Sequence, residues 1–245
     1  MNAGLTICFA IIAALFASVG QAGAPGYVAV MGLFGHGPAA IKPVALALTT
    51  LVAAIGVFGF QRAGLLRTRD WAPFAVLGIP ASVIGGLIDL QPSTFRAAMT
   101  VILLGAGAQM AWAARMTAQL DARAREKPPL VGAVICGGLS GLLAGITGIG
   151  GGLFIAATML LLGWAPTKRV AACAQTSNLY TAACAFTAIW LAHPALPPEL
   201  PGWSLAAALG GLLGVWIGSR YLPAKALRFM LAAILLASGV RLALS

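Results

Sequence analysis

The sequence predicts an all-α integral membrane protein, on the basis of its composition, its apolar runs and the placement of its charges. Of 245 residues, 60% are hydrophobic and 8% are charged, and the mean hydropathy is +0.97. A soluble domain carries about a quarter charged residues, and one this apolar would expose large apolar patches. The net charge of +10 comes from bases that lie between apolar runs. This placement follows the positive-inside rule of membrane proteins and argues against nucleic acid as a partner.

Apolar runs divide the chain into two halves with the same plan. Each half begins with a long run that glycines interrupt, at 20–26 and at 145–152. Three uninterrupted runs follow in each half, close to the roughly 20 residues that a spanning helix needs. We therefore predict a first repeat over 1–116, a polar linker over 117–129 and a second repeat over 130–245, in one membrane domain. The interrupted runs are 4–34 and 130–162, and the uninterrupted ones are 38–60, 72–89, 94–115, 168–191, 203–219 and 224–243.

Matching residues support the internal repeat. The sequence from Gly35 to Pro38 aligns with the sequence from Gly163 to Pro166, and both have the pattern Gly-x-x-Pro. The same alignment places the segment 48–50 opposite 176–178. Two-fold internal repeats of this kind are common in transporter folds.

The basic residues predict that the two halves are inverted in the membrane. The loop 61–70 carries Arg62, Arg67 and Arg69, and the linker is also basic, so both are expected in the cytoplasm. The loop 192–202, which corresponds by repeat to 61–70, has neither Lys nor Arg and is expected outside. An inverted repeat needs an odd number of crossings per half. Each interrupted run is therefore predicted to be a broken or re-entrant helix pair, followed by three transmembrane helices. The alternative is eight spans in two parallel repeats.

The glycine-rich breaks are the first candidate binding site. Irregular backbone at membrane depth is tolerated where it is buried in protein or lines a cavity. A helix that starts after such a break presents free N–H groups and the positive end of its dipole, which together bind anions. The alternative is close helix packing through small residues. The candidate residues in the breaks are Gly23, Gly26, Tyr27, Thr147, Gly148, Gly150, Gly151 and Gly152.

Neutral polar side chains within two spanning runs are the second candidate. Four of them are consecutive, from Gln175 through Thr176 and Ser177 to Asn178, and the repeat places Thr49 and Thr50 opposite. Such groups donate hydrogen bonds to an oxyanion without adding charge, although hydrogen bonds between helices are an equal alternative for any one of them. Lys42 either guides an anion or extends its amine to the membrane surface.

Other functions lack the residues they require. The sequence has no carboxylate in the middle of a span, and no zinc, Walker or Gly-x-Ser-x-Gly motif. Its four cysteines, Cys8, Cys136, Cys173 and Cys184, include no Cys-x-x-Cys pair. We therefore expect neither an enzyme nor a metal or other cofactor.

These motifs together resemble the TauE/SafE sulfite exporter family, also called the toluene-sulfonate uptake permease family. The resemblance rests on the segment from Gly145 to Gly152, the Gly-x-x-Pro motif and the segment 174–177, with a divergent copy in the first half. It implies a secondary transporter of sulfite, sulfonates or related organosulfur anions, often an exporter, in a bacterial-type inner membrane. The expected partners are the small anion and the lipid bilayer, and a homodimer is left open. The alternative functions are an anion channel and a membrane assembly or scaffold protein without transport activity.

Overall fold

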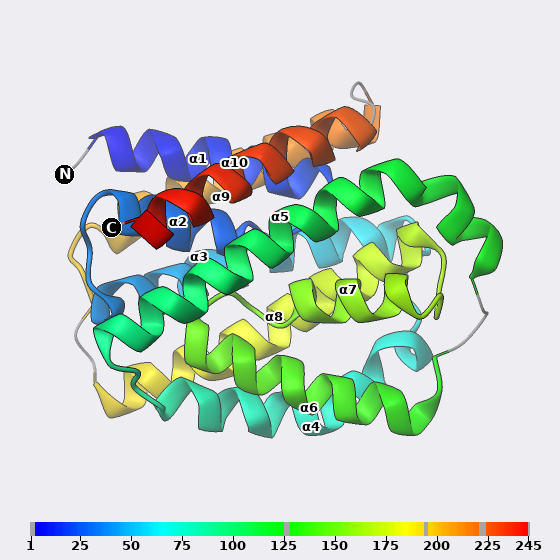
Figure 1. Cartoon of the computed structure of the whole chain (residues 1–245), viewed down its shortest axis with the longest axis horizontal. Coiled ribbons are helices and arrows are strands. Elements are labelled where there is room, and N and C mark those ends of the chain that lie inside the picture. The colour runs from blue at the N-terminus through cyan, green and yellow to red at the C-terminus, as the bar shows by residue number, and fades with distance from the viewer. Residues whose placement is uncertain (1–2, 125–127, 194–195, 221–223, 245) are drawn as a thin grey trace.

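The described residues of the computed structural model, 3–124, 128–193, 196–220 and 224–244, form ten helices and no strand. The helices run roughly along the long axis of the molecule (Figure 1). The predicted all-α class is confirmed, while Arg125 and Lys127 of the predicted linker lie outside the described residues. The helices are α1 (Ala3–Ser18), α2 (Ala24–Leu33), α3 (Pro38–Arg62), α4 (Thr68–Leu87), α5 (Pro92–Arg123), α6 (Leu130–Thr147), α7 (Gly152–Leu161), α8 (Thr167–Ala192), α9 (Leu200–Arg220) and α10 (Ala224–Leu244).

Several helices are long and apolar enough to cross a membrane. Among the described residues these are α3, α4, α6 and the Pro92–Met116 part of α5. The helices α1, α2 and α7 are apolar but shorter, as expected for two interrupted runs. α5 continues to Arg123, seven residues into the segment predicted as a linker, because Ala, Gln, Leu and Arg favour a helix even outside the membrane.

The helices pack in a continuous row with a second pair laid across it. In the row, α1 contacts α9, α9 contacts α3, α3 contacts α8, α8 contacts α4, and α4 contacts α6. Figure 1 shows α4 and α6 along one side of the molecule and α1 and α9 toward the other. The pair α5 and α10 contacts the short helices, α5 meeting α7 and α10 meeting α2. The pattern of contacts is the same for both halves of the chain when α1 to α5 are matched in order with α6 to α10. For example, α1 contacts α9 as α6 contacts α4, and α2 contacts α10 as α7 contacts α5.

Helices in corresponding positions of the two halves run antiparallel. Gly56 of α3 faces Gln175 of α8, whereas Leu46, earlier in α3, clusters with Ala182, later in α8. α5 and α10 pack antiparallel in the same way, because Gly107 faces Leu236 and the earlier residue Leu104 faces Gly239.

Glycines bring α4 and α6 into backbone contact between Phe74 and Gly86 of α4 and Gly137 and Ile146 of α6, with the two helices parallel. A Cβ atom built on Gly137 would lie 2.0 Å from the carbonyl oxygen of Phe74. On Gly141 it would lie 2.2 Å from the carbonyl oxygen of Gly78, and on Gly145 2.3 Å from that of Ser82. No side chain fits at these distances, so small residues set the separation of the two helices.

Polar contacts join several helices at one end of the molecule, which we call the basic end because it carries Arg67 and Lys168. The guanidinium of Arg169 in α8 forms a bidentate ion pair with the buried carboxylate of Asp70 in α4. Asp121 of α5 accepts hydrogen bonds of 2.7 Å from both the backbone N–H and the hydroxyl of Thr167. The other end, which we call the opposite end, holds the turns α2–α3 and α4–α5.

The close contact of α4 and α6 predicts a large difference between two Gly→Ala substitutions. Gly141→Ala should lower the melting temperature of the purified protein by several degrees, because overpacking costs about 1–3 kcal/mol. Gly105→Ala on α5, where a Cβ would meet nothing within 4 Å, is the matched control and should be neutral or stabilising. Thermal unfolding in detergent measures both. Equal melting temperatures for the two variants would contradict the role given to Gly141.

Candidate functional site

The second glycine-rich break lies at the centre of the candidate site. α6 ends at Thr147 and α7 begins at Gly152, so the chain reverses within four residues. Gly148 and Gly150 have φ angles of 78° and 79°, in the left-handed region that residues with a Cβ rarely adopt. The turn therefore requires glycine at these two positions. Surrounding side chains also leave little space for a larger residue, since a Cβ on Gly150 would lie 2.6 Å from Asn178 Oδ1.

Side chains of α8 bond the start of α7. The backbone N–H of Gly151 donates to Thr181 Oγ1 at 3.0 Å, and that of Gly152 donates to Asn178 Oδ1 at 2.7 Å. These two N–H groups were expected to be free for an anion. Asn178 and Thr181 occupy them, which satisfies the backbone inside the membrane.

Several buried polar side chains of α3 and α8 have no partner. The hydroxyls of Thr49 and Ser177 and both amide atoms of Gln175 are buried without a hydrogen bond to the protein. Gly150 packs against Thr49 and Asn178, and Gly151 packs against Ser177. Buried polar groups are normally paired, so an unpaired set like this one indicates a ligand or water.

A pocket of about 420 Å³ connects the basic end to Gln175. Its mouth carries Lys168, and its wall includes Gly20 of the first break and Gly56 of α3. Gly56 leaves space for the Gln175 amide, since a Cβ there would lie 2.0 Å from Nε2. No acidic residue lines the pocket among the described residues. The described lining of the pocket therefore presents no negative charge between the basic end and Gln175.

Three of the predicted threonines form hydrogen bonds to their own helices instead. Thr50 donates to the carbonyl of Leu46 at 2.8 Å, and Thr176 donates to Ala172 at 2.9 Å. Thr147 donates to the carbonyl of Leu143 at 2.6 Å. Their hydroxyls are less available to a ligand than those of Thr49 and Ser177.

The first glycine-rich break is more apolar than the second. Tyr27 packs edge-to-face on Phe9, with ring centroids 5.7 Å apart, and its buried hydroxyl has no partner. A Cβ on Gly26 would lie 2.6 Å from Ile12, so this glycine serves close packing. Gly23 has a φ of 86° and precedes α2, where no side chain caps the helix. Of this break, Gly20 lines the pocket, whereas Gly23, Gly26 and Tyr27 do not.

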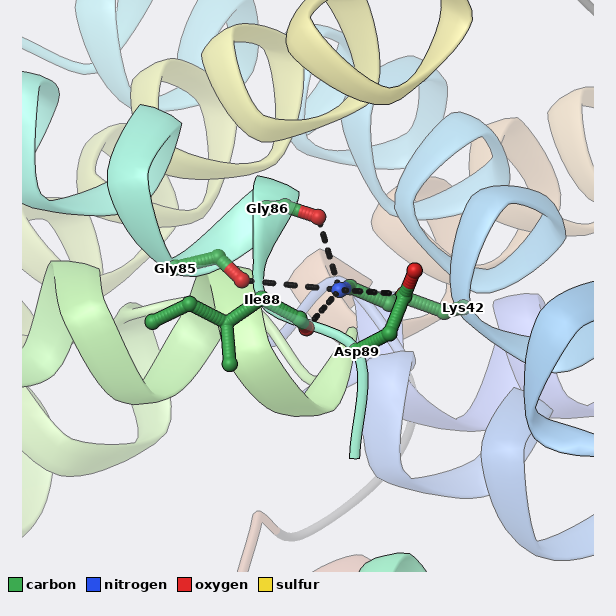
Figure 2. Close-up of polar contacts among 5 residues, drawn as sticks. All are labelled: Lys42, Gly85, Gly86, Ile88 and Asp89. Carbon is green, nitrogen blue, oxygen red and sulfur yellow. Dashed lines mark hydrogen bonds and ion pairs between the residues drawn. The ribbon is translucent and has the colours of Figure 1, made fainter. Parts of the chain in front are cut away.

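Lys42 has partners that the sequence did not indicate. Its side chain is buried, and its ammonium donates to the carbonyl oxygens of Gly86 and Ile88 at 2.7 Å and of Gly85 at 3.4 Å (Figure 2). The exposed carboxylate of Asp89 lies 3.8 Å away. The amine therefore satisfies the last carbonyls of α4, rather than extending to the membrane surface. Gly148 packs on the backbone of Lys42, so α3, α4 and the second break meet here.

Sequence reasoning missed Gly56, Tyr180 and Thr181. Gly56 lies two helical turns after Thr49, and Thr181 lies one turn after Ser177, so helical spacing from the predicted residues would have found both. The Tyr180 hydroxyl is buried near Ser177. Tyrosine is common in apolar helices, and no sequence signal separates this one.

Comparison with known proteins identifies the family. The model of the family described as Sulfite exporter TauE/SafE matches residues 5–242. The chain belongs to this family. A curated relative, the "Probable membrane transporter protein y4hK" of Sinorhizobium fredii (strain NBRC 101917 / NGR234), is 42% identical over 239 residues, covering 98% of this chain and 97% of the relative. No solved structure matches the chain. The TauE/SafE family and this relative indicate a membrane transporter, and the apolar helices make this chain a multi-pass membrane protein.

The contacts of Lys42 predict a structural role for its amine. Lys42→Met removes the donor for three carbonyls in the protein interior and should destabilise the protein by about 1–3 kcal/mol or more. Lys168→Met, at an exposed lysine, is the matched control and should leave the melting temperature nearly unchanged. Thermal unfolding in detergent compares the two. A Lys42→Met variant as stable as Lys168→Met would show that the amine does not hold α4.

Proposed function

We propose that the chain is a secondary transporter that exports small sulfur-containing anions, such as sulfite or sulfonates, by alternating access across the bacterial-type inner membrane. One observation carries the proposal: the pocket from the basic end is lined by Gln175, whose buried amide has no partner in the protein. The family name supports sulfite as the type of cargo, and the name of the relative supports membrane transport.

Neutral donors suit the reversible binding of an oxyanion. The Gln175 amide and the hydroxyls of Thr49 and Ser177 can each donate a hydrogen bond to a sulfur oxyanion. Hydrogen bonds to a charged group contribute about 1.5–3 kcal/mol each, which is enough for selectivity without holding the anion too tightly for release. Lys168 at the mouth raises the local concentration of anions.

The directions of the helices support an inverted repeat with the boundaries given above. α3 is antiparallel to α8 and α5 to α10, as expected when the second half is inverted relative to the first. Left-handed glycines support the same alignment: Gly20 and Gly148 are 128 residues apart, as are Gly35 and Gly163. Two halves of opposite orientation around one central site are the usual basis of alternating access.

The two ends of the molecule differ as one state of an alternating-access cycle would. At the basic end the pocket leads inward, and at the opposite end Lys42 bonds α3 to the end of α4. The positive-inside rule places the basic end in the cytoplasm. In the proposed cycle, we assign this arrangement to a state that is open to the cytoplasm, in which an exporter loads its cargo.

Sulfite efflux from loaded proteoliposomes tests the proposed site. Gln175→Leu and Thr49→Val should each lower the initial rate about tenfold or more, because each removes a donor to the anion. Their melting temperatures should stay the same or rise, because the groups removed have no partner in the protein.

Thr187→Val is the matched control, since Thr187 lies exposed on the same helix α8 as Gln175. It should transport at the rate of the unchanged protein. Full efflux in both site variants would refute the site. Efflux that rises linearly with sulfite and shows no counterflow would indicate a channel, and no efflux from the folded protein would favour the scaffold function.

The proposed orientation is tested with single cysteines in a chain whose four native cysteines are replaced by alanine. Gln61→Cys at the basic end and Ser93→Cys at the opposite end both replace exposed residues. An impermeant maleimide should label Ser93→Cys in intact spheroplasts and Gln61→Cys only in inside-out vesicles. The reverse pattern would place the pocket on the outer side and rule out loading from the cytoplasm.

A further inference from the structure

A second pocket lies at the opposite end of the molecule from the one that reaches Gln175. It has a volume of about 300 Å³ and lies between α2, the α2–α3 turn, the start of α3, the start of α5 and the end of α10. The two pockets have no lining residue in common. Its contents are therefore separate from the proposed transport site.

The polar part of this pocket is positive. Arg96, one turn into α5, and His36 in the α2–α3 turn both line it, and no acidic residue does so among the described residues. Asp89, which is near in sequence, is the carboxylate beside Lys42. α3 and α5 both begin at the pocket, with Pro38 and Pro92 in their first turns, so the positive ends of two helix dipoles add to the charge. This combination favours a phosphate or another oxyanion.

The rest of the pocket is apolar and is continuous with a lipid-facing surface. Phe95 and Met99 of α5 and Leu242 of α10 form its wall. Large apolar side chains are exposed next to it: Leu33 at 37% and Phe34 at 46%, with Leu244 at 84%. In a membrane protein, exposed apolar side chains face lipid, so the pocket opens toward the edge of the bilayer.

We propose that this pocket binds one anionic phospholipid. The lipid phosphate lies against Arg96 and His36, and part of an acyl chain lies along Phe95, Met99 and Leu242. The pocket is large enough for a headgroup and the first part of a chain, with the remainder in the bilayer. Because α10 belongs to the second half of the chain and the other lining elements to the first, the bound lipid joins the two halves.

Native mass spectrometry of the full chain, purified in detergent, tests the proposal with phosphatidylglycerol and phosphatidylcholine as probes. Phosphatidylglycerol should bind at least tenfold more tightly, because phosphatidylcholine adds a positive choline to the same phosphate. Arg96→Gln should remove most of this preference, and Gly32→Leu should block the pocket sterically, since Gly32 lines it next to Leu242.

Arg67→Gln, at an exposed arginine of the basic end, is the control and should retain the preference. No preference for phosphatidylglycerol, or an equal loss in Arg67→Gln and Arg96→Gln, would overturn the proposal. Displacement of the lipid by millimolar free sulfite would also overturn it, since the pocket would then be a second site for the cargo. Arg96 is exposed, so its variant tests the proposal even where Gly32→Leu fails to fold.

Discussion

The arrangement around the second break follows from the need to pair backbone polar groups in an apolar solvent. When α6 stops at Thr147 and α7 starts at Gly152, the N–H groups at the start of α7 have no partner in their own helix. Asn178 and Thr181 supply the partners, which explains why a helix in the middle of the protein carries polar side chains. Glycines then let α8 come close enough for those bonds to form.

The same constraint separates the polar groups that have a partner within the protein from those that have none. Asn178, Thr181, Thr50 and Thr176 all have partners within the protein, and their hydrogen bonds account for their presence. Gln175 has none, although burying an amide without a partner costs about 1–3 kcal/mol. Among the described polar groups that are buried without a partner, Gln175 lines the pocket, where a bound anion would supply the missing hydrogen bonds. The proposed transport site is therefore defined by missing hydrogen bonds as much as by residue type.

Much of the fold could be predicted from the sequence because lipid imposes simple rules. The apolar runs predicted α3, α4, α8, α9 and α10 to within about four residues at each end, whereas α5 extends eight residues past its predicted end. The two glycine clusters predicted the breaks between α1 and α2 and between α6 and α7. The partners of Lys42 could not be predicted, because they are backbone carbonyls of α4, more than 40 residues away. Backbone acceptors carry no sequence signal. The hydrogen bonds that cap α7 were missed for a related reason. The donors at the start of α7 are backbone N–H groups, and the packing of α8 decides which side chains accept from them.

The amine of Lys42 makes the two ends of the molecule unequal. The repeat places Val170, a buried apolar residue, at the corresponding position of the second half. A carrier whose two ends were held closed by identical bonds would, when empty, be open to either side of the membrane for equal fractions of the time. The ion pair of Arg169 with Asp70 at the basic end also has no counterpart, because the repeat places Ile41 and Pro198 at those positions. A net difference of about 1.4 kcal/mol between the two sets of bonds gives a ratio of ten to one. In the proposed carrier, the side that the empty protein faces is therefore set by the difference between the Lys42 bonds at one end and the Arg169–Asp70 ion pair at the other.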